Sequence, residues 1–206
     1  MHKSIKPIAV FYEYLPEPAV QYCYSFWAKY NFEFQIKKKR NSKLGDYRFD
    51  FRSNKHSITV NADLNKYAFL VTYLHEVAHF LTQIKYGMKA EPHGKEWKTE
   101  FVTVAKPLLV PEVFPSNILM ALQKYFNNPK ATSCADPMLV KALNMHDNDP
   151  SKNLLSDIDF GKKFDLNGRI FSKIENRRTR VLCLEIASGK KYLISKAALV
   201  DPEIKL

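Results

Sequence analysis

The spacing of hydrophobic positions changes twice in the first half of the chain. Residues 16–31 carry apolar side chains at helical spacing after a proline-rich start, and residues 33–61 alternate apolar and polar positions in three runs. Residues 65–86 then repeat with a period of about 3.6, up to Gly87. The pattern predicts a helix, a three-stranded antiparallel meander and a long helix that ends at Gly87. The apolar stripe of the long helix comprises Leu70, Leu74, Val77, Leu81 and Ile84.

Two further helices are predicted after the long one. One begins near His93, and the other begins near Ser116, which is a candidate N-cap after Pro115. Residues 1–128 are therefore interpreted as one α+β domain, in which a small antiparallel sheet packs with helices. Residues 129–156 are rich in Asn, Asp, Ser and Pro around one short apolar helical stretch, which is typical of a connecting segment.

The remaining residues, 157–206, divide into short β-like runs. The turn signals between these runs are Asn167-Gly168, Glu175-Asn176 and Ser188-Gly189. The pattern predicts a small β-rich module that is marginally stable by itself.

Composition indicates a folded protein with a basic surface. Of the 206 residues, 46% are hydrophobic and 26% are charged, which is usual for a soluble globular protein. The formal net charge of +11 favours a polyanionic partner such as DNA, because Lys and Arg release condensed counterions when they neutralise phosphates. No run of apolar residues is long enough to span a membrane.

The three cysteines, Cys23, Cys134 and Cys183, are far apart and never form a Cys-x-x-Cys pair. This spacing excludes a disulfide framework and a complete zinc ribbon, and it favours a reducing compartment. The N-terminal apolar run is too short for a signal peptide. A cytoplasmic location is therefore expected.

The predicted long helix contains His75, Glu76 and His79 in the pattern His-Glu-x-x-His. Positions i and i+4 lie on one helical face, so His75 and His79 can present their imidazoles to one ion. Zinc lowers the pKa of a bound water to about 7, within reach of an adjacent carboxylate. The sequence thus predicts a single Zn²⁺ ion held by the two histidines, with Glu76 as the general base.

A catalytic zinc needs a third protein ligand. The spacing His-Glu-x-x-His-x-x-Gly-x-x-His is excluded, because Thr82 and Lys85 occupy the glycine and histidine positions. The remaining candidates are His93 and two carboxylates of the next helix, Glu96 and Glu100. We favour His93, since imidazole suits zinc well and the following Gly94 lets the backbone pass close to the site.

The stretch "TYLHEVAHFL", followed after a short gap by "HGKEWKTEF", resembles the SprT-like (Spartan-type) metalloprotease family. The order of elements over residues 1–128, with "NSKLGDYRF" and "ITVNADLN" before the metal helix, is similar as well. The resemblance implies zinc ligands His75, His79 and His93, with Glu76 as general base. It also implies a protease that acts on proteins bound or crosslinked to DNA, a role in DNA-protein crosslink repair.

The family's frequent four-cysteine zinc ribbon is not present, because only Cys134 and Cys183 lie in the corresponding region. The C-terminal module is therefore interpreted as a degenerate ribbon, held by packing and without a second zinc ion.

Two segments are densely basic, and the first overlaps the predicted sheet. The first segment gives the candidate nucleic-acid contacts Lys37, Lys38, Lys39, Arg40, Lys43, Arg48 and Arg52. The rings of Tyr47, Phe49 and Phe51 are close in sequence and could stack on unpaired bases. The second segment is "RRTR" at 177–180. The alternative interpretation is a solvated strand edge that lysines protect from aggregation.

Together these features predict a zinc-dependent metalloendopeptidase that acts on DNA-associated proteins. The alternative is a non-enzymatic DNA-associated adaptor, in which four protein ligands close a structural metal site. Tyr47, Arg48 and Tyr73 are candidates for stabilising the oxyanion. His56 and His146 are interpreted as surface or structural residues. The sequence does not indicate an oligomeric state.

Overall fold

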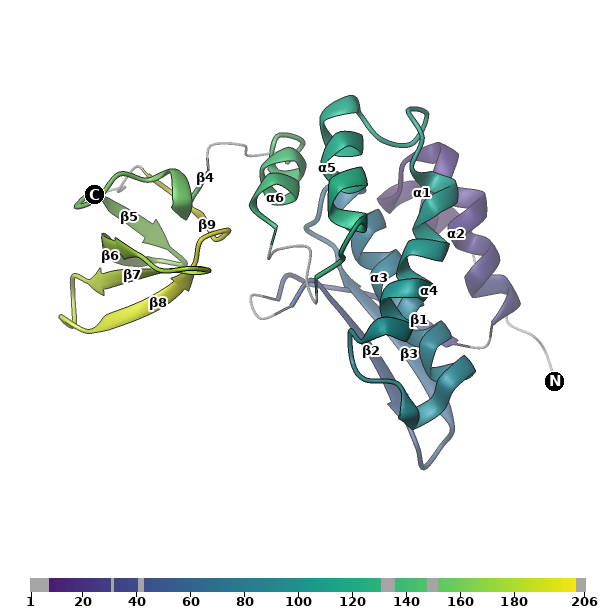
Figure 1. Ribbon diagram of the computed structural model, residues 1–206. Coiled ribbons are helices and arrows are strands. Elements are labelled where there is room, and N and C mark those ends of the chain that lie inside the picture. The colour runs from purple at the N-terminus through teal and green to yellow at the C-terminus, as the bar shows by residue number, and fades with distance from the viewer. Residues whose placement is uncertain (1–7, 31, 41–42, 131–135, 148–151, 203–206) are drawn as a thin grey trace. The chain divides into compact units, whose positions relative to one another are not determined.

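A computed structural model of the chain describes residues 8–30, 32–40, 43–130, 136–147 and 152–202 (Figure 1). The fold is α+β, as predicted, and it divides into two compact units at residues 1–131 and 132–206. The finer division at residues 128 and 156 stays a prediction. Within the described ranges, no helix combines the length and the apolar character that crossing a membrane requires.

The described part of the first unit is mainly helical. Its helices are α1 (Ala9–Tyr14), α2 (Glu17–Lys29), α3 (Lys66–Tyr86), η1 (Gly87–Lys89), α4 (Lys95–Ala105), η2 (Lys106–Leu108) and α5 (Ser116–Phe126). Its strands are β1 (Phe32–Lys37), β2 (Gly45–Asp50) and β3 (Lys55–Asn61). The long helix α3 contacts β2 and β3 and also packs along α4, so it connects the sheet to the later helices (Figure 1).

Local signals set both ends of α3. The side chain of Asn65 accepts hydrogen bonds from the backbone N–H groups of Tyr67 and Ala68, at 3.1 and 3.0 Å, and so caps the first turn. Gly87 follows the last turn with a φ of +61°, a conformation that glycine adopts without strain. The predicted termination at Gly87 is therefore confirmed.

The apolar stripe of α3 is only partly buried. Leu70, Leu74 and Val77 are buried, whereas the side chain of Ile84 is 53% exposed, so the prediction of a stripe that continues to Ile84 is wrong. Periodicity identifies the face of a helix but does not show where its packing partners end.

The predicted antiparallel meander is also wrong. The strand order is β1-β3-β2, in which β1 runs parallel to the central strand β3 and β2 runs antiparallel to it. The sheet is therefore mixed rather than antiparallel. Only the β2–β3 pair is a hairpin, and the chain after β1 passes the end of β3 to reach the opposite edge.

Asn61 at the end of β3 holds this crossing segment. Its side-chain amide donates to the carbonyls of Arg40 and Lys43, at 3.2 and 2.9 Å, and its backbone N–H donates to the carbonyl of Leu44. The guanidinium of Arg40 donates in return to Oδ1 of Asn61 at 2.7 Å and to Oγ1 of Thr59 at 3.0 Å. These bonds give the physical reason for the strand order, because they fix the β1–β2 connection across the end of β3.

The start of α5 differs in detail from the prediction. The helix begins at Ser116, and Pro115 is its N-cap, with the extended ψ of 151° that precedes a first helical turn. Ser116 is therefore the first helical residue and not the N-cap. The proline takes the N-cap position because its fixed φ suits the entry to a helix.

The second unit contains one helix and several short strands within the described residues. They are α6 (Pro137–Asn144), β4 (Asn153–Leu154), η4 (Leu155–Asp157), β5 (Lys163–Leu166), β6 (Arg169–Asn176), β7 (Arg180–Glu185), β8 (Lys191–Ser195) and β9 (Leu199–Val200). Strands β5-β6-β7-β8 form an antiparallel sheet, and β4 pairs with β9. The buried core consists of Leu155, Ile158, Phe164, Phe171, Val181, Cys183 and Val200. Cys134 lies outside the described residues.

Two of the three turns predicted in this unit are present. Asn167 and Gly168 have φ of +57° and +78° between β5 and β6, and Gly189 has a φ of +67° between β7 and β8. The third prediction, a turn at Glu175-Asn176, is wrong. Strand β6 has an irregularity between Lys173 and Glu175, and Asn176 still pairs with β7.

A buried lysine connects β6 to η4. Lys173 is 2% exposed, and its Nζ donates to the carbonyls of Leu155, Ser156 and Ile158, at 3.1, 3.0 and 2.6 Å. An ammonium group carries three donors, and each one here has a backbone acceptor. The side chain thereby fixes the segment around η4 against the sheet.

Replacement of Lys173 by Met should destabilise this unit by about 1–3 kcal/mol, because it leaves buried carbonyls without their donor. Thermal unfolding followed by circular dichroism measures the effect. Lys162→Met, which removes an exposed lysine of the same unit, is the matched control. Equal unfolding temperatures for the two variants would show that the buried ammonium contributes nothing.

Candidate metal centre

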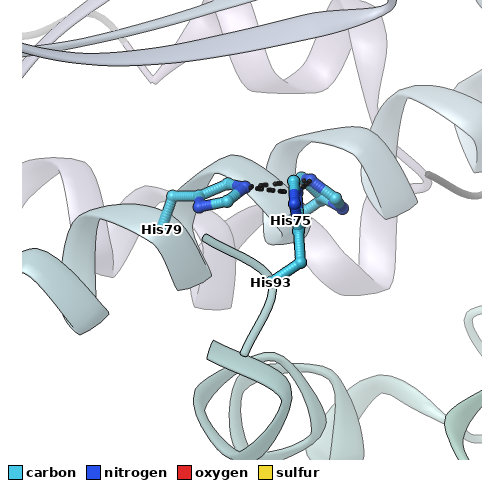
Figure 2. A group of neighbouring side chains, drawn as sticks. All are labelled: His75, His79 and His93. Carbon is cyan, nitrogen blue, oxygen red and sulfur yellow. Dashed lines mark hydrogen bonds between the residues drawn. The ribbon is translucent and has the colours of Figure 1, made fainter. Parts of the chain in front are cut away.

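Helix α3 and the loop before α4 bring three histidines together. Figure 2 shows His75 and His79 projecting from α3 toward His93, which precedes α4. Their Nε2 atoms form a triangle: His75 to His79 is 3.2 Å, His79 to His93 is 2.9 Å, and His93 to His75 is 3.3 Å. A tetrahedral zinc with Zn–N bonds of about 2.0–2.1 Å needs nitrogens about 3.3–3.4 Å apart. The three residues therefore fit a metal site.

The chain reaches this position through two unusual backbone conformations. Gly87 turns the chain away from α3, and His93 has a φ of +58°, which few residues other than glycine adopt. Gly94 follows with an extended conformation and is the N-cap of α4. A residue held in a rare conformation is frequent at functional sites, because the surrounding structure must maintain it.

The surroundings of all three imidazoles favour the neutral form, because they lower each pKa. Burial, and then the neighbouring His79 and His93, lower the pKa of His75 to about 2. Burial and His93 lower the pKa of His79 to about 3, and burial lowers the pKa of His93. Three neutral nitrogens that face one another cannot all satisfy each other by hydrogen bonds, so a cation is the partner that suits them.

Trp97 closes one side of this cluster. Its ring centroid lies 4.7 Å from that of His75, 5.3 Å from that of His79 and 4.7 Å from that of His93, and the side chain is fully buried. Trp97 follows His93 by four residues and lies in the first turn of α4. The indole thus restricts the rings of all three histidines.

The two alternative third ligands lie outside the cluster. Among the described residues, the group of potential ligand atoms close enough to share an ion contains the three histidines but neither Glu96 nor Glu100. The carboxylate of Glu100 is instead paired with Nζ of Lys85 at 2.8 Å. The geometry therefore favours His93, as the sequence interpretation did.

Glu76 belongs to α3, and its side chain contacts β2. It is 6% exposed and accepts a hydrogen bond from the backbone N–H of Tyr47. Burial, and then the charge of Asp46, raise its pKa to about 8, although the Tyr47 N–H, Arg40 and Lys43 act in the opposite direction. A cation bound by the histidines would also favour the ionised carboxylate. Glu76 could be identified from the sequence, but its contact with strand β2 could not.

Comparison with known proteins agrees with this geometry. Residues 19–114 match the sequence model of the SprT-like family. The first unit contains a SprT-like domain. The matched segment includes the whole of α3 and α4, and with them Glu76 and the three histidines. Searches of curated proteins and of solved structures returned no match.

The SprT-like domain places the three oxyanion candidates very differently. Tyr73 is fully buried and its hydroxyl donates to the carbonyl of Cys23, so it cannot reach a substrate. The side chain of Arg48 is largely exposed and pairs with Asp46 at 2.7 Å. The ring of Tyr47 lies parallel to that of His79, with centroids 6.3 Å apart. Only Tyr47 of these candidates has a described contact with a histidine of the cluster.

His56 has a defined structural role beside Tyr47. Its Nδ1 is 2.8 Å from the hydroxyl of Tyr47, and its ring stacks on Phe49 with centroids 4.6 Å apart. Burial lowers the pKa of His56. The pair fixes the orientation of the Tyr47 ring over α3, which agrees with the interpretation of His56 as structural.

The basic residues of the SprT-like domain do not form one patch. Lys37 pairs with the end of β3, whereas Arg52 lies in the turn before β3, at the opposite end of the sheet. Arg40 is bonded to Asn61, and both Lys43 and Arg48 pair with Asp46. Lys38 is exposed, and Lys39 is exposed with a long ion pair to Asp63. The exposed candidates are therefore Lys37, Lys38, Lys39, Arg48 and Arg52, of which Arg48 is held by its ion pair with Asp46.

Proposed function

We propose that this protein is a zinc-dependent metalloendopeptidase of the SprT-like type. The observation that carries the proposal is the triangle of three Nε2 atoms, together with a buried carboxylate, Glu76, on the same helix as His75 and His79. Membership of the first unit in the SprT-like family supports it. Three protein ligands are typical of catalytic zinc sites, because the fourth position stays available for water or substrate.

The histidines, Glu76 and Tyr47 have separate roles in the proposed reaction. His75, His79 and His93 would hold the ion, which supplies an acidified water and a Lewis acid for the scissile carbonyl. Glu76 accepts a proton from the attacking water and delivers it to the leaving amine. The backbone N–H of Tyr47 holds the Glu76 carboxylate in place between these two transfers.

The non-enzymatic alternative requires a closed, four-ligand metal site. In the part of the chain that the structure describes, the candidate cluster contains three side chains and no fourth His, Cys, Asp or Glu. This favours catalysis over a purely structural metal. Cleavage of an unfolded protein substrate, measured with zinc and with a chelator, tests the proposal, and the absence of zinc-dependent cleavage would refute it.

We propose further that the substrates are proteins bound or crosslinked to DNA. The net charge of +11 supports a polyanionic partner, and the exposed residues Lys37, Lys38 and Lys39 are consecutive at the end of β1. Single-stranded DNA is therefore expected to bind the chain and to stimulate cleavage.

Replacement of Lys37, Lys38 and Lys39 by Ala should weaken binding of a single-stranded oligonucleotide. If each lysine neutralises one phosphate, the slope of log K against log salt should fall in magnitude by about 2, since each single-strand contact contributes about 0.7. Fluorescence anisotropy between about 50 and about 200 mM salt measures this slope. The control is the triple variant at Lys95, Lys106 and Lys124. These lysines are exposed and lie in or at the ends of helices of the same unit. No binding at low salt, or an unchanged slope, would exclude the contact.

A further inference from the structure

Gly45, the first residue of β2, lies directly against Glu76. An added Cβ at Gly45 would collide with Oε1 of Glu76 and would be 2.8 Å from its Cγ. It would also be 2.7 Å from Cγ2 of Thr72, one turn earlier on α3. Real Cβ atoms essentially never approach heavy atoms this closely. The space that any side chain would need at position 45 is therefore occupied mainly by the carboxylate arm of Glu76.

The backbone conformation does not explain this glycine. The described glycines with positive φ are Gly87, Gly161, Gly168 and Gly189, and Gly45 is not among them. Gly45 instead pairs with Val60 in a regular antiparallel register. A glycine inside a strand weakens it, unless another group approaches the backbone closely. Here the approaching group is Glu76.

The surroundings leave Glu76 little freedom to accommodate a methyl group at position 45. Thr72 cannot rotate away easily, because its hydroxyl is bonded to the carbonyl of Ala68 at 2.8 Å in the buried interior of α3. Glu76 is itself 6% exposed and bonded to the backbone of Tyr47 on the same strand. A methyl group at position 45 would thus displace either the carboxylate or the whole of β2.

We infer that Gly45 is a positioning residue: because it has no side chain, the Glu76 carboxylate has room to lie against β2. The inference rests on the proposed function, because it gives Glu76 the role of general base. Gly45 touches neither the substrate nor the ion in this scheme. It acts only through the position of Glu76.

A double-mutant cycle tests the contact without any activity measurement. Gly45→Ala should lower the unfolding temperature of the zinc-loaded chain by about 4 °C, as expected for overpacking in a chain of this size. In the Glu76→Ala background, which removes Cγ and the carboxylate, the same substitution should lower it by less than half as much. Equal shifts in the two backgrounds would overturn the inference.

A measurement of cleavage activity is the second test of the inference. Gly45→Ala should retain zinc and reduce kcat/KM by about 100-fold through kcat, since a displacement of about 1 Å of a reacting group has effects of this size. Adding Thr72→Ser relieves the contact with Cγ2 but not the contact with Glu76, so activity should stay low. Recovery of activity in that double variant, or a Gly45→Ala variant as active as wild type, would overturn the inference. If wild type itself shows no cleavage, the proposed function fails, and the unfolding cycle still decides whether Gly45 positions Glu76.

Discussion

Replacement of Glu76 by Gln is expected to abolish peptide cleavage while zinc stays bound. The amide keeps the size of the side chain and its contact with β2, but it cannot accept a proton from the attacking water. Loss of a positioned general base lowers rates by about 10²–10⁴-fold. Initial cleavage rates of a fluorescent protein substrate, with zinc content from atomic absorption on the same samples, measure both parts of the prediction.

Glu96→Gln is the matched control for this experiment. Glu96 lies on α4, close to His93 in sequence but outside the histidine cluster, so its amide variant should cleave like wild type. Substantial cleavage by Glu76→Gln would contradict the role of Glu76. Loss of zinc from that variant would instead show that the carboxylate holds the ion.

Replacement of His93 by Ala should lower zinc affinity by more than about 100-fold. Loss of a residue that merely orients a ligand already reduces affinity by about 10–100-fold, and loss of a ligand should exceed this. The remaining pair, His75 and His79, provides only two nitrogens for the ion. Competition with a chromogenic chelator measures the affinity, and circular dichroism shows whether the fold is retained.

Glu100→Ala provides the comparison for the third ligand. Glu100 is buried on α4 and paired with Lys85, so its loss should affect stability more than zinc affinity. If His93→Ala kept full zinc occupancy and Glu100→Ala lost it, the third ligand would be the carboxylate and the site would have to be redrawn.

Helix α3 could be predicted because its signals are local. Asn65 caps α3, Gly87 ends it, and the i, i+4 spacing places His75 and His79 on one face whatever the rest of the chain does. His93 was one of several candidates. Its approach to the other two depends on the loop conformation after Gly87, which spacing alone does not determine.

The order of the sheet could not be predicted in the same way. Alternation identifies strands but not their partners, and the parallel pairing of β1 with β3 depends on bonds that Asn61 makes to residues about twenty positions earlier. The contact between Gly45 and Glu76 is likewise tertiary. The sequence does not reveal this contact, because a glycine before an alternating run resembles an ordinary turn residue.

The mixed sheet also implies an order of assembly. Strands β2 and β3 are joined only by residues 51–54, so their hairpin closes a short loop and can form early. Strand β1 must close a longer loop before its parallel pairing with β3 is complete. Strand β2 packs against Glu76, so the half of the sheet that can form early contains this contact. Transient opening of β1 at the other edge would leave the contact intact.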